Sequence, residues 1–165
     1  MIKFVRLAAL AAIATAVATP AFAQTAANAN STVRITKPLI LNRTAHMDFG
    51  LVTVWGDGTA TMDQAGALNC TAATLVCALS GTPATFTIQG TNNRTVDISA
   101  SASVALQSAG APDLTLVTDY PDTQVLNSSG VGNTTSFGIG GSIDLLETTP
   151  DGTYTGTINV TVSYL

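Results

Sequence analysis

Catalysis by a Ser–His–Asp arrangement would have to use His46, the only histidine of the chain. It stands in the segment HMDFG, where Ala45, Met47 and Phe49 alternate with it, so a strand here places His46 on the solvated face. Ser142 lies in GGSID, which lacks the second glycine of the Gly-x-Ser-x-Gly turn that exposes a nucleophilic serine. The pattern does not favour nucleophilic catalysis.

Carboxylates offer two further kinds of chemistry. Asp119 and Asp122, in DYPD, could form the carboxylate pair of a glycosidase, but the proline between them favours a turn. Asp57 and Asp63 lie near expected turns, where carboxylates and loop carbonyls could bind calcium. Neither stretch matches the spaced ligands of a calcium loop, and aspartates in turns commonly accept hydrogen bonds from nearby backbone. We therefore interpret these residues as structural.

The remaining candidate binding groups are few. One histidine and two cysteines are too few ligands for an ordinary zinc site. Gly138–Gly141 is followed by no lysine and enters a strand, so it is not a phosphate-binding loop; its glycines favour a bulge or close sheet packing. Trp55, the only tryptophan, borders a Gly-Asp-Gly turn and is either a core lid or a rim residue. We predict no catalytic residue, no cofactor and no metal, and hence no enzyme.

Residues 1–23 have the pattern of a secretory signal peptide. Lys3 and Arg6 precede the apolar stretch LAALAAIATAVA, and Ala21 and Ala23 fit the small-x-small rule for cleavage before Gln24. A membrane anchor is the alternative, but the apolar run is shorter than the roughly 20 residues that span a bilayer. We expect an exported protein in the periplasm, at the cell surface or outside the cell, without membrane insertion after leader cleavage.

Export gives a role to Cys70 and Cys77. In an oxidising compartment two such cysteines normally form a disulfide. Their bond would close an eight-residue loop and contribute about 2.5 kcal/mol of stability by the chain-entropy estimate. A redox-active pair is the alternative, but CTAATLVC lacks the two-residue spacing of those motifs. We predict a structural disulfide.

The length and net charge of the chain limit the number of domains and the kinds of partner that we expect. The full chain of 165 residues carries a net charge of −4, and removal of the leader leaves 142 residues with a net charge of −6. That length suffices for one domain, residues 24–165, with a core of its own. Four scattered cations on an acidic chain cannot neutralise a row of phosphates, so we expect no nucleic-acid partner.

The composition and patterning favour strands throughout. Threonine and serine supply 36 of the 142 residues after the leader, and β-branched threonine favours strands over helix interiors. Apolar residues recur with period two between turns rich in glycine, asparagine, aspartate and proline. We expect an all-β, antiparallel, immunoglobulin-like sandwich of about seven to nine strands, with long loops at 107–113 and 127–135. The expected strands are TVRI, HMDFGLVTV, ATFTIQG, RTVDISA, LTLV, SIDLL and TINVTVSY.

Several stretches together resemble a family of secreted proteobacterial β-proteins known only as a domain of unknown function. That family looks related to spore coat protein U and to the pilin subunits of chaperone–usher systems. The stretches span nearly the whole chain after the leader, and the C-terminal one is the most specific. They are KPLIL, MDFG, GTATMD, ATFTIQG, GIGGSIDL and GTYTGTINVTVSY.

The C-terminus is similar to that of pilins, which end in an alternating strand with an aromatic penultimate residue and a glycine fourteenth from the end. Tyr164 is penultimate here, and Gly152 is fourteenth. The resemblance implies that this strand pairs with a periplasmic chaperone during export and that an usher assembles the subunits. Its physical basis is β-augmentation, in which an edge strand supplies backbone hydrogen bonds. The implied pairing side chains are Ile158, Val160, Val162 and Tyr164.

Such a subunit also needs an N-terminal donor strand for its neighbour, and residues 24–36 are the candidate extension. Its donor face is weak because its first three residues are small and bury little area. The alternative, which we favour for residues 33–41, is that the segment 32–41 forms the first strand of the domain itself, interrupted at Pro38. The candidate donor face is Ala27, Ala29, Ser31, Val33 and Ile35.

The leading functional expectation is an exported, non-enzymatic structural protein: a pilin-like or coat-like subunit of a cell-surface fibre or layer that self-assembles by strand exchange. The alternative is a monomeric periplasmic or secreted β-sandwich that binds glycan or another surface ligand. It would use the loops near Trp55 and at 127–135.

Overall fold

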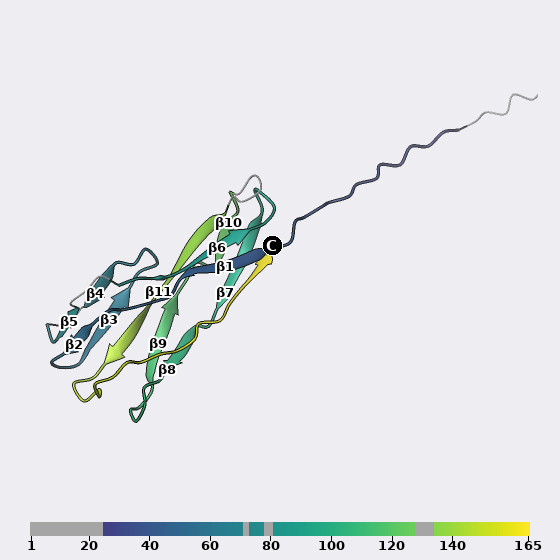
Figure 1. Ribbon diagram of the computed structural model, residues 1–165. Helices are drawn as coiled ribbons and strands as arrows, with labels where there is room; N and C mark the ends of the chain where they lie inside the picture. The colour runs from purple at the N-terminus through teal and green to yellow at the C-terminus, as the bar shows by residue number, and fades with distance from the viewer. Residues whose placement is uncertain (1–24, 71–72, 78–80, 128–133) are drawn as a thin grey trace, which may run out of the picture. The chain divides into compact units, whose positions relative to one another are not determined.

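The computed structural model describes residues 25–70, 73–77, 81–127 and 134–165 (Figure 1). Within these ranges every regular element is a β-strand, all pairings are antiparallel, and no helix occurs, hence none that could cross a membrane. The all-β antiparallel fold class is confirmed, and the arrangement is consistent with a β-sandwich. The predicted leader lies outside the described residues.

The chain divides into two units, residues 1–34 and Ile35–Leu165. The described part of the first unit, residues 25–34, has no regular secondary structure, and its side chains are exposed. All the strands belong to the second unit.

Seven strands form the largest sheet, in which β1 (Ile40–Ala45) is one of the edge strands. Its order is β1-β6-β11-β3-β4, and β9 pairs with β11 while β8 pairs with β9. The 11-residue β11 is central because its first part pairs with β6 and its second part pairs with both β3 and β9. The other members are β3 (Gly58–Met62), β4 (Leu68–Cys70), β6 (Ala84–Gln89), β8 (Ser103–Leu106), β9 (Leu114–Asp119) and β11 (Thr135–Leu145).

Two smaller sheets complete the described structure. A three-stranded sheet has the order β10-β7-β12, so the C-terminal strand is an edge strand. A two-stranded sheet pairs β2 with β5. The bounds are β10 (Thr123–Val125), β7 (Thr95–Ala100), β12 (Val160–Tyr164), β2 (Val52–Val54) and β5 (Leu75–Cys77).

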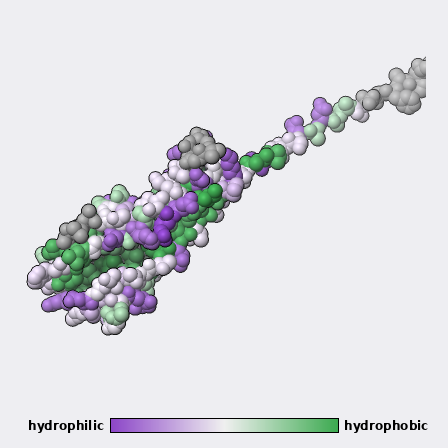
Figure 2. All heavy atoms as spheres, in the orientation of Figure 1, coloured by the Kyte–Doolittle hydropathy of each residue, from purple (hydrophilic) through white to green (hydrophobic). Residues whose placement is uncertain are grey.

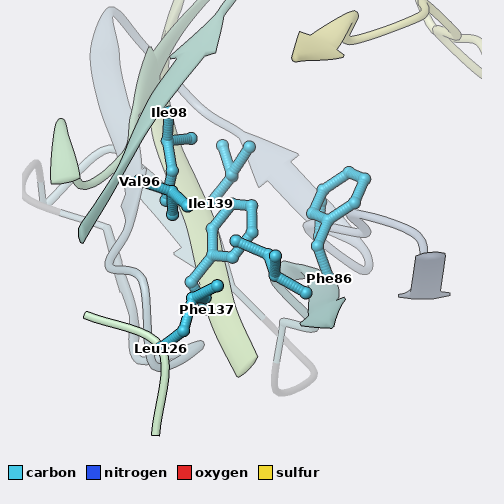
Figure 3. Packing of buried hydrophobic residues seen from close by; sticks show 8 residues of the cluster. Phe86, Val96, Ile98, Leu126, Phe137 and Ile139 are labelled. Carbon is cyan, nitrogen blue, oxygen red and sulfur yellow. The ribbon is translucent and has the colours of Figure 1, made fainter. Parts of the chain in front are cut away.

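The main core lies between β7 of the small sheet and β6 and β11 of the large one. Alternate residues of β6 and β7 are buried, as period-two patterning requires. Phe86 and Phe137 are paired across β6 and β11 and stack with ring centroids 5.4 Å apart. Figure 3 shows these rings and the side chains of Val96 and Ile98 pointing toward one another. Side chains from two facing sheets are buried against each other, which is the packing of a β-sandwich.

A second buried cluster is formed by side chains of β5, β8, β9 and β11. It contains Leu75, Val104, Leu116, Ile143 and Leu145. The half-buried side chains of Met47 and Ile158 pack against this cluster and against the main core, so the two clusters adjoin.

Several strand boundaries differ from those predicted by alternation. The predicted strand within residues 32–41 is wrong over most of its length: residues 32–39 have no regular structure, and β1 begins only at Ile40, after Pro38, which has no N–H to donate. The predicted HMDFGLVTV strand is interrupted because Gly50 has φ +69° and its N–H donates to Asp48 Oδ1 (2.8 Å). Of this predicted strand, only Val52–Val54 forms a strand, β2. The structure describes 12 strands rather than seven to nine because four of them are three-residue segments.

The glycines of β11 allow the backbone of the β3–β4 turn to lie directly against the strand. A Cβ on Gly140 would overlap the carbonyl oxygen of Met62 and lie 2.6 Å from the carbonyl carbon of Asp63. A Cβ on Gly138 would overlap the carbonyl oxygen of Gln64. These positions therefore exclude any side chain, which agrees with the close sheet packing expected for these glycines.

We expect Gly140→Val to lower the free energy of unfolding by about 3 kcal/mol, because the new side chain must displace backbone atoms. Urea denaturation followed by circular dichroism measures this change. Gly110→Ala is the control: Gly110 has φ +78° but no atom within 4 Å of its Cβ position, so it should cost only about 1 kcal/mol of backbone strain. Equal effects of the two substitutions would contradict the close approach.

Candidate functional site

Two edge strands of the folded unit lie at the ends of different sheets. Among the described residues, β1 pairs only with β6, and β12 pairs only with β7. Each strand therefore has one edge of backbone N–H and C=O groups that no other described strand uses. Such an edge can pair with an added strand.

Hydrogen bonds at the two ends of β12 show which of its backbone groups β7 uses. Ser101 N–H donates to the carbonyl of Asn159 (3.0 Å), and Leu165 N–H donates to the carbonyl of Thr95 (3.2 Å). In an antiparallel ladder, residues that bond to one neighbour alternate with residues whose polar groups point to the opposite side. By this alternation the residues whose N–H and C=O groups point away from β7 are Val160, Val162 and Tyr164.

Half-buried apolar side chains accompany these two edges. They pack against the main core without being fully covered, and they come from the β1 region on one side and the C-terminal segment on the other. Figure 2 shows hydrophobic atoms gathered in a band on the face where β1 and β12 run, bordered by hydrophilic atoms. We call this set the apolar strip; its members are Leu39, Leu41, Met47, Ile158, Val160, Val162 and Tyr164.

The apolar strip is closed at one end by the Tyr164 hydroxyl. This group donates to the carbonyl of Lys37 (2.7 Å) and accepts from the N–H of Thr91 (2.7 Å). Lys37 N–H in turn donates to Thr91 Oγ1 (2.7 Å). Gly90 leaves room for this contact, because a Cβ there would lie 2.5 Å from the Tyr164 hydroxyl and 2.8 Å from Leu39. The penultimate tyrosine thus connects the end of β12 to the segment that leads into β1.

Gly152 lies apart from β12. It occupies an exposed bend, and a Cβ there would lie 2.5 Å from Ser108 Oγ. Ile158 precedes the first residue of β12 but packs against both buried clusters. Of the predicted pairing residues, the structure therefore brings four into the apolar strip and leaves Gly152 outside it.

The candidate donor residues are exposed. Those at 27, 29, 31 and 33 lie in the described part of the N-terminal unit, and Ile35 begins the second unit. Val33 and Ile35 are 79 % and 82 % exposed, so their apolar surface is almost entirely in water. Exposed aliphatic side chains that alternate along an extended segment suit a strand that becomes buried on pairing.

The predicted disulfide is present in the structure. Cys70 and Cys77 are bonded with their Cα atoms 6.2 Å apart, within the usual range. The bond joins β4 to β5 and so ties the two-stranded sheet to the edge of the large sheet. On the outer side of β2, Trp55 is 71 % exposed and Leu51 61 % exposed. Trp55 is thus a rim residue and not a core lid.

The groups considered for catalysis or metal binding are exposed or serve in turns. His46 is exposed, and Asp119 and Asp122 are exposed around the β9–β10 turn. Asp63 Oδ1 accepts from two backbone N–H groups of its own turn, and Asp57 Oδ1 accepts from the N–H of Glu147 (2.9 Å). Within the described ranges no group of three histidine, cysteine or acidic residues could hold a metal ion.

Sequence reasoning missed one side of the apolar strip. Leu39, Leu41 and Met47 alternate with polar or exposed neighbours, and that signal was available in KPLIL and HMDFG. Alternation identifies a half-buried face but does not identify the strand across from it, so their juxtaposition with β12 required the structure.

We expect Tyr164→Phe to lower the free energy of unfolding by about 2 kcal/mol, because two hydrogen bonds are lost and the part-buried Thr91 N–H is left without a partner. Chemical denaturation measures the change. Tyr154→Phe is the matched control: its hydroxyl makes one exposed bond, to the Pro150 carbonyl (2.9 Å), and its loss should cost less than about 1 kcal/mol. A Tyr164→Phe effect no larger than the control would show that the strip is not closed in this way.

Residues 39–164 match a family model described as "Domain of unknown function (DUF4402)". The match covers most of the chain, and the chain belongs to this family. No curated protein and no solved structure matches it.

Proposed function

We propose that this member of the DUF4402 family is an exported, non-enzymatic structural protein that assembles by strand exchange. Residues 25–36 of one copy would add as a strand along the open edge of β12 in another copy. The observation that carries the proposal is the apolar strip: half-buried side chains beside a backbone edge that no other described strand covers.

The dimensions and chemistry of the two partners are complementary. Twelve extended residues span about 40 Å, whereas the five residues of β12 span about 17 Å, so the segment can cover the edge and still connect two copies. The added strand would give hydrogen bonds to the free N–H and C=O groups of β12. Full burial of an aliphatic side chain such as Val33 or Ile35 contributes about 1.5–3 kcal/mol.

The small side chains of the donor limit the affinity. Ala27, Ala29 and Ser31 bury little surface, so most of the hydrophobic stabilisation comes from the two larger residues at the end of the segment. An exposed edge of this kind also promotes aggregation before assembly. This supports transient cover by a periplasmic chaperone strand and ordered assembly through an usher, into a pilus-like fibre or a coat-like surface layer.

We expect Val33→Asp combined with Ile35→Asp to abolish oligomers of the protein without its leader. Charged side chains cannot be buried against the apolar strip without a partner. Light scattering after size-exclusion chromatography, together with unheated SDS gels, measures assembly. Asn30→Asp with Thr32→Asp is the matched control, because it adds the same charge to the opposite face of the segment and should leave assembly intact.

Deletion of residues 24–34 tests the donor role further, since this variant keeps its acceptor edge. A synthetic peptide of residues 25–36 should bind the variant and raise its melting temperature. Persistence of oligomers in the deletion variant, or absence of peptide binding, would refute strand exchange through this segment.

A second candidate function is a binding module for glycan, and the exposure of Trp55 favours it. An indole that lies 71 % in solvent can stack on the apolar face of a sugar ring. The other predicted loop, 127–135, lies largely outside the described residues.

We expect Trp55→Ala to remove glycan-array signals if this module operates, because the stacking surface is lost. Leu51→Ala on the same outer side is the control and should reduce them less. As Trp55 is the sole tryptophan, glycan binding to the unmodified protein should also shift its fluorescence. Unchanged array signals for Trp55→Ala would exclude the role of this residue.

A further inference from the structure

A hollow of about 410 Å³ lies on the outer face of the large sheet. Its floor is formed by β9 and β11, where Ser142 is paired with Val117. Along β11 the floor residues Ser142 and Asp144 alternate with Ile143 and Leu145 of the second cluster, so the hollow and the core lie on opposite faces.

Two turns form the walls of the hollow. Pro112 and Asp113 precede β9, and residues 148–150 follow β11. The turn after β11 is held by two hydrogen bonds: Thr149 N–H donates to the carbonyl of Leu146 (2.9 Å), and Leu146 N–H donates to Thr149 Oγ1 (3.0 Å). In the segment before β9, Ala111 N–H donates to the carbonyl of Ser108 (3.2 Å). Each wall contains a proline, whose fixed φ limits backbone motion. The hollow is therefore shaped before any ligand arrives.

The two carboxylates of the hollow are oriented by neighbouring side chains. Asp144 Oδ1 accepts from the Thr59 hydroxyl (2.7 Å), and Asp113 Oδ2 accepts from Gln107 Nε2 (3.3 Å). Each carboxylate keeps a second oxygen and further lone pairs that can accept hydrogen bonds. The Thr149 hydroxyl already accepts one bond and retains its own proton to donate.

The charge of the lining disfavours anionic ligands. Two carboxylates without a lysine or arginine among the lining residues repel phosphates, sulfates and uronates. Two acidic side chains are fewer ligands than a protein cation site normally uses. Ligand hydroxyls, in contrast, can donate to the carboxylates and exchange hydrogen bonds with Thr115 and Ser142, while Val117 and Leu146 offer apolar surface for carbon-bound hydrogens.

From these features we infer that the hollow is a binding site for one neutral saccharide unit, either free or at the end of a glycan. This site goes beyond the proposed assembly function, since it lies on the outer face of β9 and β11 and not on the apolar strip. It is also distinct from the outer side of β2, where Trp55 lies. A bound sugar would leave strand exchange unaffected.

The test is a titration of the ¹⁵N-labelled protein without its leader with methyl glycosides of glucose, galactose and N-acetylglucosamine, and with glucuronate and glucosamine. At least one neutral glycoside should shift the amide signals of Thr115, Ser142 and Asp144 at about 10 mM, as expected for a shallow site. Glucuronate should not shift them. A short neutral oligosaccharide tests whether the unit binds better at the end of a chain.

Two variants test whether the sugar binds in the hollow. Asp144→Asn should weaken it about tenfold by removing a charged acceptor. Thr115→Trp should abolish it by filling the hollow from an exposed strand position that tolerates an aromatic side chain. Asp122→Asn is the control, with the same change of charge outside the hollow. Spectra of each variant without sugar establish that it is folded.

The outcomes separate this inference from the proposed functions. Shifts confined to the hollow and lost in Thr115→Trp support it, whether or not the protein forms oligomers. No shift with any neutral sugar, stronger binding of glucosamine than of every neutral sugar, equal binding by Thr115→Trp, or shifts around Trp55 alone would each overturn it.

Discussion

Every β-strand carries hydrogen-bonding groups along two edges, and the strands β1 and β12 have a described partner along only one of them. Both strands also cover the main core incompletely, because they lie at the ends of two facing sheets. Unused backbone groups and uncovered apolar side chains thus occur at the same place. Either alone would be unremarkable at a protein surface, but together they define a surface suited to one more strand.

The interior of the unit depends on a different constraint, the close contact between β11 and the β3–β4 turn. Because β11 presents no side chain at Gly138 and Gly140, backbone atoms of the turn occupy that space. The same long strand joins β6, β3 and β9. The disulfide then links β4 to β5 and secures a two-stranded sheet that would be marginal by itself. The close packing around β11 and the open edges of β1 and β12 therefore lie in separate parts of the fold.

Much of this fold follows from the sequence. ATFTIQG and RTVDISA have a clear period of two and correspond closely to β6 and β7. The alternation of Ile158 to Tyr164 identifies the half-buried face of the C-terminal segment, although β12 begins only at Val160. The oxidising compartment implied by the predicted leader also made the disulfide predictable.

Other features could not be predicted because they depend on contacts between distant segments. Glycine is depleted in strands, so the three glycines of β11 obscured its first part and only the SIDLL part was predicted. Thr32 to Ile35 alternate like a strand yet form none, since alternation says nothing about whether a partner edge is present. The hollow combines turns near residues 112 and 149 with two strands, and no local pattern indicates such a grouping.

The bond between the Tyr164 hydroxyl and the Lys37 carbonyl joins positions 127 residues apart. A polypeptide emerging from its amino end cannot make this connection until its penultimate residue is available. Contacts of such high contact order slow the folding rate, because a long loop must close before they form. We therefore expect native structure at this end of the molecule to form late in folding, which leaves the apolar strip uncovered until then.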